Sequence, residues 1–315
     1  MMTPILCSSG DLLADRRVGY ADMLAASGDL AAAADLMADA LALVPGWAAG
    51  WFHLGELAEA AGRDTAAQDA FAQALALDPA DRLGATLRLD LLRKVPLTEG
   101  MPAAFVAALF DQYAPDFDAS LVDRLNYRVP QKLAAALPDR PFDAVLDLGC
   151  GTGLMGAELR GRAAHLTGWD ISEGMLAEAQ AKGIYDALAC HDLNTLAPAQ
   201  GRYDLIVAAD VFMYLGALET VISWAVQALR PGGVLAYSCE SHDGPEPILL
   251  RPSRRYAHSV GYLTDLLQAA GVPGGVVSPI ALRRDRGEDV AGVMVVAQVN
   301  HTLRDRSGEA ECELA

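Results

Sequence analysis

The feature that most constrains this chain is the run Val-Leu-Asp-Leu-Gly-Cys-Gly-Thr-Gly at residues 145–153. Its apolar residues predict a buried strand, its three alternating glycines predict a tight turn, and the following Leu154 and Met155 predict a helix. Glycine lets the backbone turn sharply and leaves no side chain between the backbone and a ligand. The run therefore predicts the first unit of a doubly wound α/β sheet, with a ligand bound at the turn.

The glycine turn leaves more than one interpretation open. Gly151, Gly153 and Gly156 match the GxGxxG spacing of dinucleotide-binding folds, a weak signal when taken alone. Asp147 is badly placed for a pyrophosphate but well placed for a ligand with an ammonium and a sulfonium group. The whole run closely resembles motif I of the class I S-adenosylmethionine-dependent methyltransferases. An ordinary strand-to-helix turn without a ligand is the remaining alternative.

Charge and cysteine usage limit the partners that we expect. The 315 residues carry a formal net charge of −17, and such an acidic surface repels phosphate backbones, so nucleic acid is not an expected partner. The five cysteines show no CxxC spacing and no cluster with histidine, which favours a reducing, cytoplasmic setting and no metal site. We expect no membrane partner, because no uncharged stretch reaches membrane-spanning length and residues 1–10 do not resemble a signal peptide.

The N-terminal third contains a repeat of 34 residues. When residues 14–47 are aligned with residues 48–81, Gly28 falls on Gly62, and small, apolar and proline positions also coincide. Each copy predicts a helical hairpin, and the spacing resembles tetratricopeptide repeats. Two such units rarely bury enough surface alone, so residues 81–93 are expected to form a capping helix. The repeats could offer a concave surface to a protein partner, or could only pack against the rest of the chain or self-associate.

The break between the two predicted domains lies at residues 95–102, where two prolines and a glycine interrupt the helical pattern. We therefore predict a tetratricopeptide-like helical domain over residues 11–97 and a methyltransferase-like domain over residues 103–300. The polar, acidic residues 301–315 lack periodicity and are expected to form a disordered tail.

Acidic residues follow the second and third predicted strands. Asp170 lies 19 residues after Gly151, the spacing at which an acid at a strand tip accepts hydrogen bonds from both ribose hydroxyls. Ser172 is a candidate N-cap for the next helix. The resemblance implies that Met175 covers an adenine face and that Asp192 accepts the adenine amino group. It also implies an entry segment that caps the cofactor. The full set of expected cofactor contacts is Tyr113, Asp147, Gly149, Cys150, Gly151, Asp170, Ile171, Met175, His191, Asp192 and Leu193.

Three residues are candidates for catalysis. Asp210 and Tyr214 follow the fourth predicted strand, whose tip faces the crevice where the strand order reverses. His258 could take a proton from an incoming amine or hydroxyl. Packing roles are the alternatives for Tyr214 and for His258, which we place at the start of the last major helix, ending at Ala270. Residues 240–252 are expected to form a Gly/Pro-rich loop at the substrate mouth.

Five segments occur in the order found in the family: the glycine run with Asp147, Asp170 with the following Ser172 and Met175, Asp192, Asp210, and Pro-Gly-Gly at residues 231–233. We expect Pro-Gly-Gly to separate a helix from the fifth strand. The resemblance implies a seven-stranded sheet in the order 3-2-1-4-5-7-6, S-adenosylmethionine as cofactor, and in-line displacement that needs positioning more than a strong base. The combined architecture resembles bacterial predicted methyltransferases with N-terminal tetratricopeptide repeats. Three functions stay open: methylation of a small-molecule or carrier-bound acceptor, methylation of a protein client recruited by the repeats, and cofactor binding without turnover.

Overall fold

The computed structural model describes residues 8–93, 100–119, 121, 125–199, 201–285 and 287–299. The predicted tail at residues 301–315 lies outside the described residues, as do residues 95–99 of the predicted linker. In the described part of the chain, no helix is both long enough and apolar enough to cross a bilayer.

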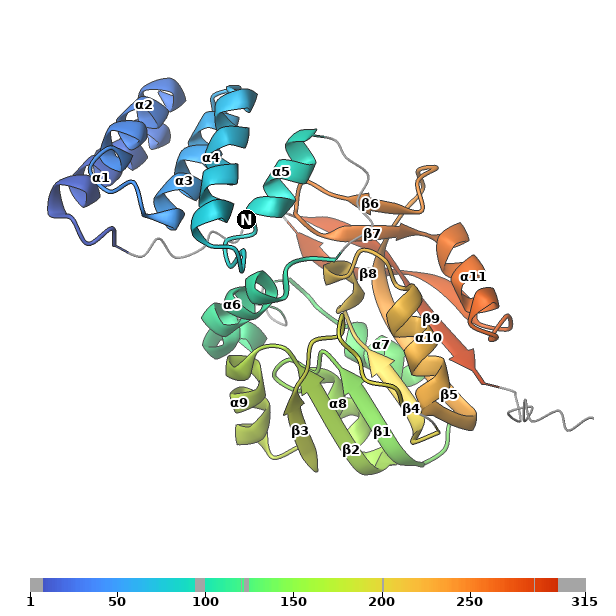
Figure 1. Cartoon of the computed structure of the whole chain (residues 1–315). Coiled ribbons are helices and arrows are strands. Elements are labelled where there is room, and N and C mark those ends of the chain that lie inside the picture. Colours follow the sequence, from blue (N-terminus) through green and yellow to red (C-terminus); the bar gives the residue numbers. More distant parts are fainter. Residues whose placement is uncertain are drawn as a thin grey trace, which may run out of the picture.

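The N-terminal third is helical, as the repeat predicted, and forms a row of helices beside the sheet (Figure 1). Asp11 caps the first helix by accepting hydrogen bonds from the Leu13 and Ala14 backbone N–H groups. Gly28 and Gly62 adopt positive φ angles of 92° and 73° just after the first helix of each hairpin. The helices are α1 (Leu12–Ala26), α2 (Leu30–Leu41), α3 (Ala48–Ala60), α4 (Asp64–Leu77) and α5 (Ala85–Arg93).

The remaining chain forms an α/β sheet in which five parallel strands meet an antiparallel hairpin. Seven strands pair in the order β3-β2-β1-β4-β5-β9-β8, with β9 antiparallel to both of its neighbours. Numbered along the chain, these seven strands have the predicted order 3-2-1-4-5-7-6. They are β1 (Phe142–Leu148), β2 (Ala163–Asp170), β3 (Ala187–Cys190), β4 (Tyr203–Ala208), β5 (Leu229–His242), β8 (Val276–Asp285) and β9 (Glu288–Gln298).

Both faces of the sheet are covered by helices, so β1 is apolar on each side. Leu146 and Leu148 belong to a buried cluster with residues of α10 and α11, whereas Val145 belongs to a cluster with residues of α7 and α8. Burial on both faces is what a central parallel strand requires. The covering helices are α7 (Val129–Ala136), α8 (Leu154–Leu159), α10 (Glu219–Ala228) and α11 (Val260–Ala269), with α9 (Glu173–Lys182) near β3 and α6 (Ala103–Tyr113) above the strand ends.

Three predictions for the region after β4 were wrong. Strand β5 begins at Leu229, so Pro-Gly-Gly lies inside the strand, beside an irregularity in its pairing with β4. The expected loop at residues 240–252 contains the end of β5 and the short strand β6 (Ile248–Leu250). His258 lies in strand β7 (Tyr256–Ser259), which pairs with both β5 and β6. The last helix begins only after Ser259, whose side chain accepts the Tyr262 N–H and caps it.

The helical row contacts the sheet domain through its last helix. Leu87 of α5 packs with Met101, Phe105 of α6 and Tyr256 of β7, and all four side chains are buried. The guanidinium group of Arg254, next to β7, lies 5.4 Å from the centre of the Phe105 ring. Helix α5 therefore rests on the small β6–β7 hairpin that extends from β5 (Figure 1).

The two helices of the second hairpin cross at a glycine, which gives a direct test of their packing. A Cβ atom on Gly55 of α3 would lie 2.6 Å from a ring carbon of Phe71, which is fully buried. We expect Gly55→Ala to lower the free energy of unfolding by about 1–3 kcal/mol, because the ring must move. Gly19→Ala in α1 is the matched control, since its Cβ would meet no atom within 4 Å. It should raise stability by up to about 1 kcal/mol, as alanine favours helix.

Urea-induced unfolding of both variants measures this difference. A Gly55→Ala protein as stable as the Gly19→Ala protein would contradict the packing of α3 on α4.

Candidate functional site

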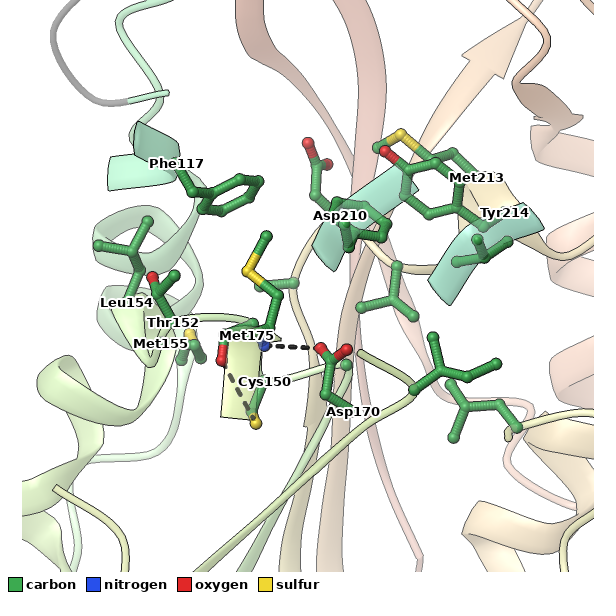
Figure 2. A pocket seen from close by; sticks show the side chains of 18 of the residues that line it. Phe117, Cys150, Thr152, Leu154, Met155, Asp170, Met175, Asp210, Met213 and Tyr214 are labelled. Carbon is green, nitrogen blue, oxygen red and sulfur yellow. Dashed lines mark hydrogen bonds between the residues drawn. The ribbon is translucent and has the colours of Figure 1, made fainter. Parts of the chain in front are cut away.

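A cavity of about 320 Å³ lies where the carboxyl ends of the parallel strands meet helix α6. This volume is typical of small-molecule sites, and its position at the strand ends is the usual one in a doubly wound sheet. Figure 2 shows side chains from both sides of the cavity, with Asp170 at its floor, Phe117 on one side and Asp210 and Tyr214 on the other. The cavity is therefore the candidate site.

The glycine turn forms one wall of the cavity. Gly149 and Gly151 have positive φ angles of 63° and 53°, and a Cβ atom on Gly149 would lie 2.4 Å from Val211 Cγ2. A Cβ atom on Gly151, by contrast, would meet no atom within 4 Å. Glycine at position 149 is thus required both by backbone angle and by the neighbouring chain, and the backbone at Gly151 is open to a ligand.

Asp170 ties the tips of β1 and β2 together. Its Oδ2 accepts the Gly151 N–H at 2.8 Å (Figure 2), and its Oδ1 accepts the Ser172 N–H at 2.9 Å. Burial raises the pKa of Asp170 above its ordinary value, while these backbone donors oppose the rise. The carboxylate therefore fixes the glycine turn and the start of α9 and still lines the cavity.

The wall after β3 contains His191 and Asp192. Asp192 accepts hydrogen bonds from the backbone and side-chain nitrogens of Asn194 at 2.8 and 2.9 Å. The exposed His191 ring lies 4.1 Å from the Trp169 ring, measured between centroids. Met175, buried near the start of α9, completes this end of the cavity.

Helix α6 and the turn Ala114–Asp116 that follows it cover the cavity. Hydrogen bonds hold this segment in two places, one on α6 and one just before it. Asp111 accepts the Ser172 Oγ–H at 2.6 Å and the Gly174 N–H at 2.9 Å, which fixes α6 on the start of α9. On the other side the Met101 N–H donates to the Tyr214 carbonyl at 3.2 Å. The aromatic covering includes Tyr113, as expected from the sequence.

Asp147 does not line the cavity, contrary to the expectation that it faces a bound cation. Its carboxylate is 1% exposed and accepts the Tyr185 hydroxyl at 2.7 Å, beneath the glycine turn. Its other oxygen has no hydrogen-bond partner among the described residues. Burial raises the pKa of Asp147 to about 7. The alternation of side chains along β1 is the reason, since position 147 shares the face of Val145 rather than pointing along the strand toward its tip.

The opposite end of the cavity is built around Asp210 and Arg283. Asp210 has a positive φ angle of 59°, and its Oδ2 accepts from Arg283 at 2.9 Å while Ser238 Oγ lies 3.3 Å from its Oδ1. Arg283 also pairs with Glu240, and both side chains are almost fully buried. Burial opposes the charge of Arg283, but Asp210 and Glu240 outweigh it and raise its pKa. Burial raises the pKa of Asp210, and Arg283 opposes that rise.

Sequence reasoning missed Arg283, because residues 283–289 are rich in charge and such segments usually lie at the surface. Strand β8 in fact continues to Asp285, and the turn occurs at Gly287, which has a φ angle of 86°. The glycine was a usable signal for a later turn. Nothing in the local pattern indicated that Arg283 is buried, because its partners are Asp210, just after β4, and Glu240 on β5.

His258 is not at the site, which corrects its candidacy as a catalytic residue. The ring is fully buried, its Nε2 lies 2.8 Å from the Gly216 carbonyl oxygen, and it stacks on Tyr262. Burial lowers the pKa of His258. Its neighbour Arg255, which we did not single out, lines the cavity instead.

Most residues proposed from the sequence line the same cavity, and two do not. No group of three or more metal-ligating side chains occurs among the described residues. The proposed residues that line the cavity are Tyr113, Gly149, Cys150, Gly151, Asp170, Ile171, Met175, His191, Asp192, Leu193, Asp210 and Tyr214, whereas Asp147 and His258 lie outside it.

Comparison with known proteins adds an independent finding. Residues 145–233 match the family model described as a methyltransferase domain. The human methyltransferase-like protein 27 is 32% identical over 203 residues, which cover 60% of this chain and 77% of that protein. A malonyl-[acyl-carrier protein] O-methyltransferase from Enterobacter lignolyticus is 33% identical, covering 44% of this chain and 54% of that protein. This chain therefore spans about half the length of that relative.

Two more matches are of the same kind. A trans-aconitate 2-methyltransferase from Deinococcus radiodurans is 31% identical over 47% of this chain and 58% of that protein. A solved structure of an S-adenosylmethionine-dependent methyltransferase from Mesorhizobium loti is 22% identical, with a TM-score of 0.45, and covers 53% of this chain and 96% of that chain.

The buried Asp147 gives a pH-dependent prediction. Because its pKa is about 7 in the folded protein and 3.8 in a model compound, the folded state binds the extra proton, and stability falls as pH rises toward 7. An Asp147→Asn variant keeps an acceptor for Tyr185 but never ionises. Its stability relative to the unsubstituted protein should increase by about 1.4 kcal/mol per pH unit between about pH 5.5 and about pH 7, then level off.

Urea unfolding of the ligand-free proteins at several pH values measures this, with the exposed Asp285→Asn as control. The same stability difference at every pH would refute the assignment of Asp147 as a buried, titrating group.

Proposed function

We infer that this chain, which belongs to the family of S-adenosylmethionine-dependent methyltransferases, transfers a methyl group to a small-molecule or carrier-bound acceptor. The observation that carries the proposal is the single cavity wall formed by the glycine turn and Asp170, a carboxylate held by two backbone N–H groups. The names of two relatives, which specify malonyl-[acyl-carrier protein] and trans-aconitate, support an acceptor that is carrier-bound or a small molecule.

The residues at the cavity fit the cofactor. The backbone at Gly151 is open, so an extended ligand can lie against it, and acids stand at the tips of β2 and β3 as a nucleoside requires. When bound, S-adenosylmethionine supplies a methyl group attached to a positively charged sulfur atom. We propose that Asp170 receives the ribose hydroxyls, Asp192 the adenine amino group, and Met175 an adenine face.

The chain's own contribution to the reaction is to position the reactants and exclude water. Helix α6 closes the cavity from above, where Phe110 meets Tyr214 edge to face at 5.1 Å between ring centroids. Alignment of the two bound reactants can supply most of the rate acceleration of a methyl transfer, because the methyl carbon is already activated. Asp210 and Tyr214, which line the cavity at the other end, are proposed to position the acceptor.

The domain organisation supports a second candidate function. We propose that α1–α5 are tetratricopeptide-like repeats forming a domain over residues 11–97, and that residues 103–300 form the methyltransferase domain. Helix α5 rests on the β6–β7 hairpin, whose neighbour Arg255 lines the cavity. A protein client held by the repeats would thus lie near the cavity, so methylation of a protein is the alternative. Cofactor binding without turnover is the third possibility.

One experiment separates these functions. The purified chain is incubated with methyl-labelled S-adenosylmethionine and a cell extract, and the products are divided into small molecules, carrier proteins and other proteins. Label in small molecules or on a carrier supports the proposed function. Label on other proteins supports the alternative. Bound cofactor without labelled product in any fraction would contradict both.

The cofactor assignment predicts the effect of removing Asp170. We expect Asp170→Ala to weaken binding of S-adenosylhomocysteine by about 1–3 kcal/mol, roughly 5- to 150-fold in Kd, because hydrogen-bonding groups of the ligand lose their acceptor. Isothermal titration calorimetry measures the change. The exposed Asp265→Ala on α11 is the control and should bind like the unsubstituted protein. Equal affinity of the two variants would remove Asp170 from the cofactor site.

A further inference from the structure

The end of the cavity lined by Asp210 and Tyr214, where the acceptor is proposed to bind, is called here the acceptor end. It carries more positive than negative charge, although the chain as a whole is strongly acidic. Two acids, Asp210 and Glu240, lie at this end, and both pair with Arg283. The other oxygen of Glu240 is 3.2 Å from Arg251. These four groups balance one another. Arg255 is therefore an additional positive charge beside them.

Arg255 lines the cavity and is half-buried. Its backbone is fixed, because the carbonyl oxygen accepts the Arg251 N–H at 2.9 Å and the next residue, Tyr256, is buried in β7. Its side chain has no hydrogen bond or ion pair to any other residue in the part of the chain that the structure describes. A guanidinium group that is partly removed from water is stabilised by an anion, and its planar donors match a carboxylate in two parallel hydrogen bonds.

The position of Arg255 separates it from the proposed cofactor contacts. Those contacts follow β1, β2 and β3, whereas Arg255 precedes β7, on the far side of β5 in the sheet order. Its charge acts on Asp210, at the tip of β4, whose pKa it lowers against the larger effect of burial. Arg255 therefore belongs to the end of the cavity where the acceptor is proposed to bind.

Neither the histidines nor Asp210 offers a ready general base at this end of the cavity. His258 is buried elsewhere, and His191 packs against Trp169 at the other end. Both oxygens of Asp210 already lie within hydrogen-bonding distance of Arg283 or Ser238, so protonation would disturb a buried ion pair. Burial raises the pKa of the Tyr127 phenol well above its ordinary value. An acceptor that is already an anion needs no base.

We propose that the acceptor is a carboxylate, that Arg255 binds it, and that the methyl group is transferred to one of its oxygens. This inference rests on the proposed function. A carboxylate oxygen forms the new bond to the methyl carbon while the carbon–sulfur bond breaks and its electron pair stays on sulfur. The products are a methyl ester and neutral S-adenosylhomocysteine, and no proton is exchanged. The ester has lost the charge that Arg255 binds, which favours its release.

The first test is the chemistry of the product. Full-length protein is incubated with methyl-tritiated S-adenosylmethionine and the acceptor fraction of a cell extract, and the labelled product is treated with mild alkali. A methyl ester releases its label as volatile methanol, whereas methyl groups on amine nitrogen, carbon, thioether sulfur or ether oxygen remain. Amidation of carboxyl groups in the fraction with a carbodiimide and methylamine should abolish labelling. A product stable to alkali would overturn the proposal.

The second test is the role of Arg255. We expect Arg255→Gln to raise the KM for the acceptor about 10- to 100-fold, the usual effect of losing a charge-assisted hydrogen-bonded pair, while the Kd for S-adenosylhomocysteine changes less than about twofold. Arg255→Lys keeps the charge and should recover part of the loss. Arg284 is an exposed arginine on β8, and Arg284→Gln is the control. It should change neither the KM for the acceptor nor the Kd for S-adenosylhomocysteine.

The outcomes are distinguishable. Alkali-labile label together with a selective rise in the acceptor KM supports the proposal. An Arg255→Gln protein that binds S-adenosylhomocysteine as weakly as Asp170→Ala would assign Arg255 to the cofactor and overturn the proposal. An unchanged KM for the acceptor would also overturn it. Absence of labelled product from every fraction would instead refute methyl transfer itself, and this inference with it.

Discussion

The buried guanidinium of Arg283 holds three strands together at one end of the cavity. It bridges Asp210 after β4 and Glu240 on β5 from its own position on β8. Separating these groups would leave a charge in a dry interior, which costs several kcal/mol, so the strand ends are held together. The same ion pair engages Asp210, an acid at the end of the cavity where the acceptor is proposed to bind. A structural requirement of the sheet therefore limits the chemistry that the cavity can perform.

Asp170 plays a corresponding part at the other end. A carboxylate that accepts two backbone N–H groups is held in one orientation, and here those groups belong to the glycine turn after β1 and to the start of α9. The turn needs glycine because Val211, after β4, lies against position 149. Three neighbouring strands thus define the shape of the turn, which explains why a small change in one of them would alter the cavity wall.

Much of the fold, and most of the residues that line the cavity after β1, β2 and β3, were predictable from the sequence, because the signals there are local. The glycine turn and the acids that follow the strands are each recognisable within a few residues of sequence. Asp147 and His258 were misplaced for a different reason. Whether a polar side chain reaches a cavity or lies beneath it depends on the face of the strand and on partners such as Tyr185 and Gly216, which lie 38 and 42 residues away. Arg283 was missed because all its partners are distant in sequence.

The helical row bears on the same acceptor end through direct packing. Leu87 of α5 lies in one buried cluster with Phe105 of α6 and Tyr256 of β7. Phe105 belongs to the helix that covers the cavity, and Tyr256 follows Arg255 in the chain. Because close-packed side chains transmit displacement, a shift of α5 would move both α6, which covers the cavity, and β7, which Arg255 precedes. A partner that displaced α5 would therefore change the shape of the cavity at this end.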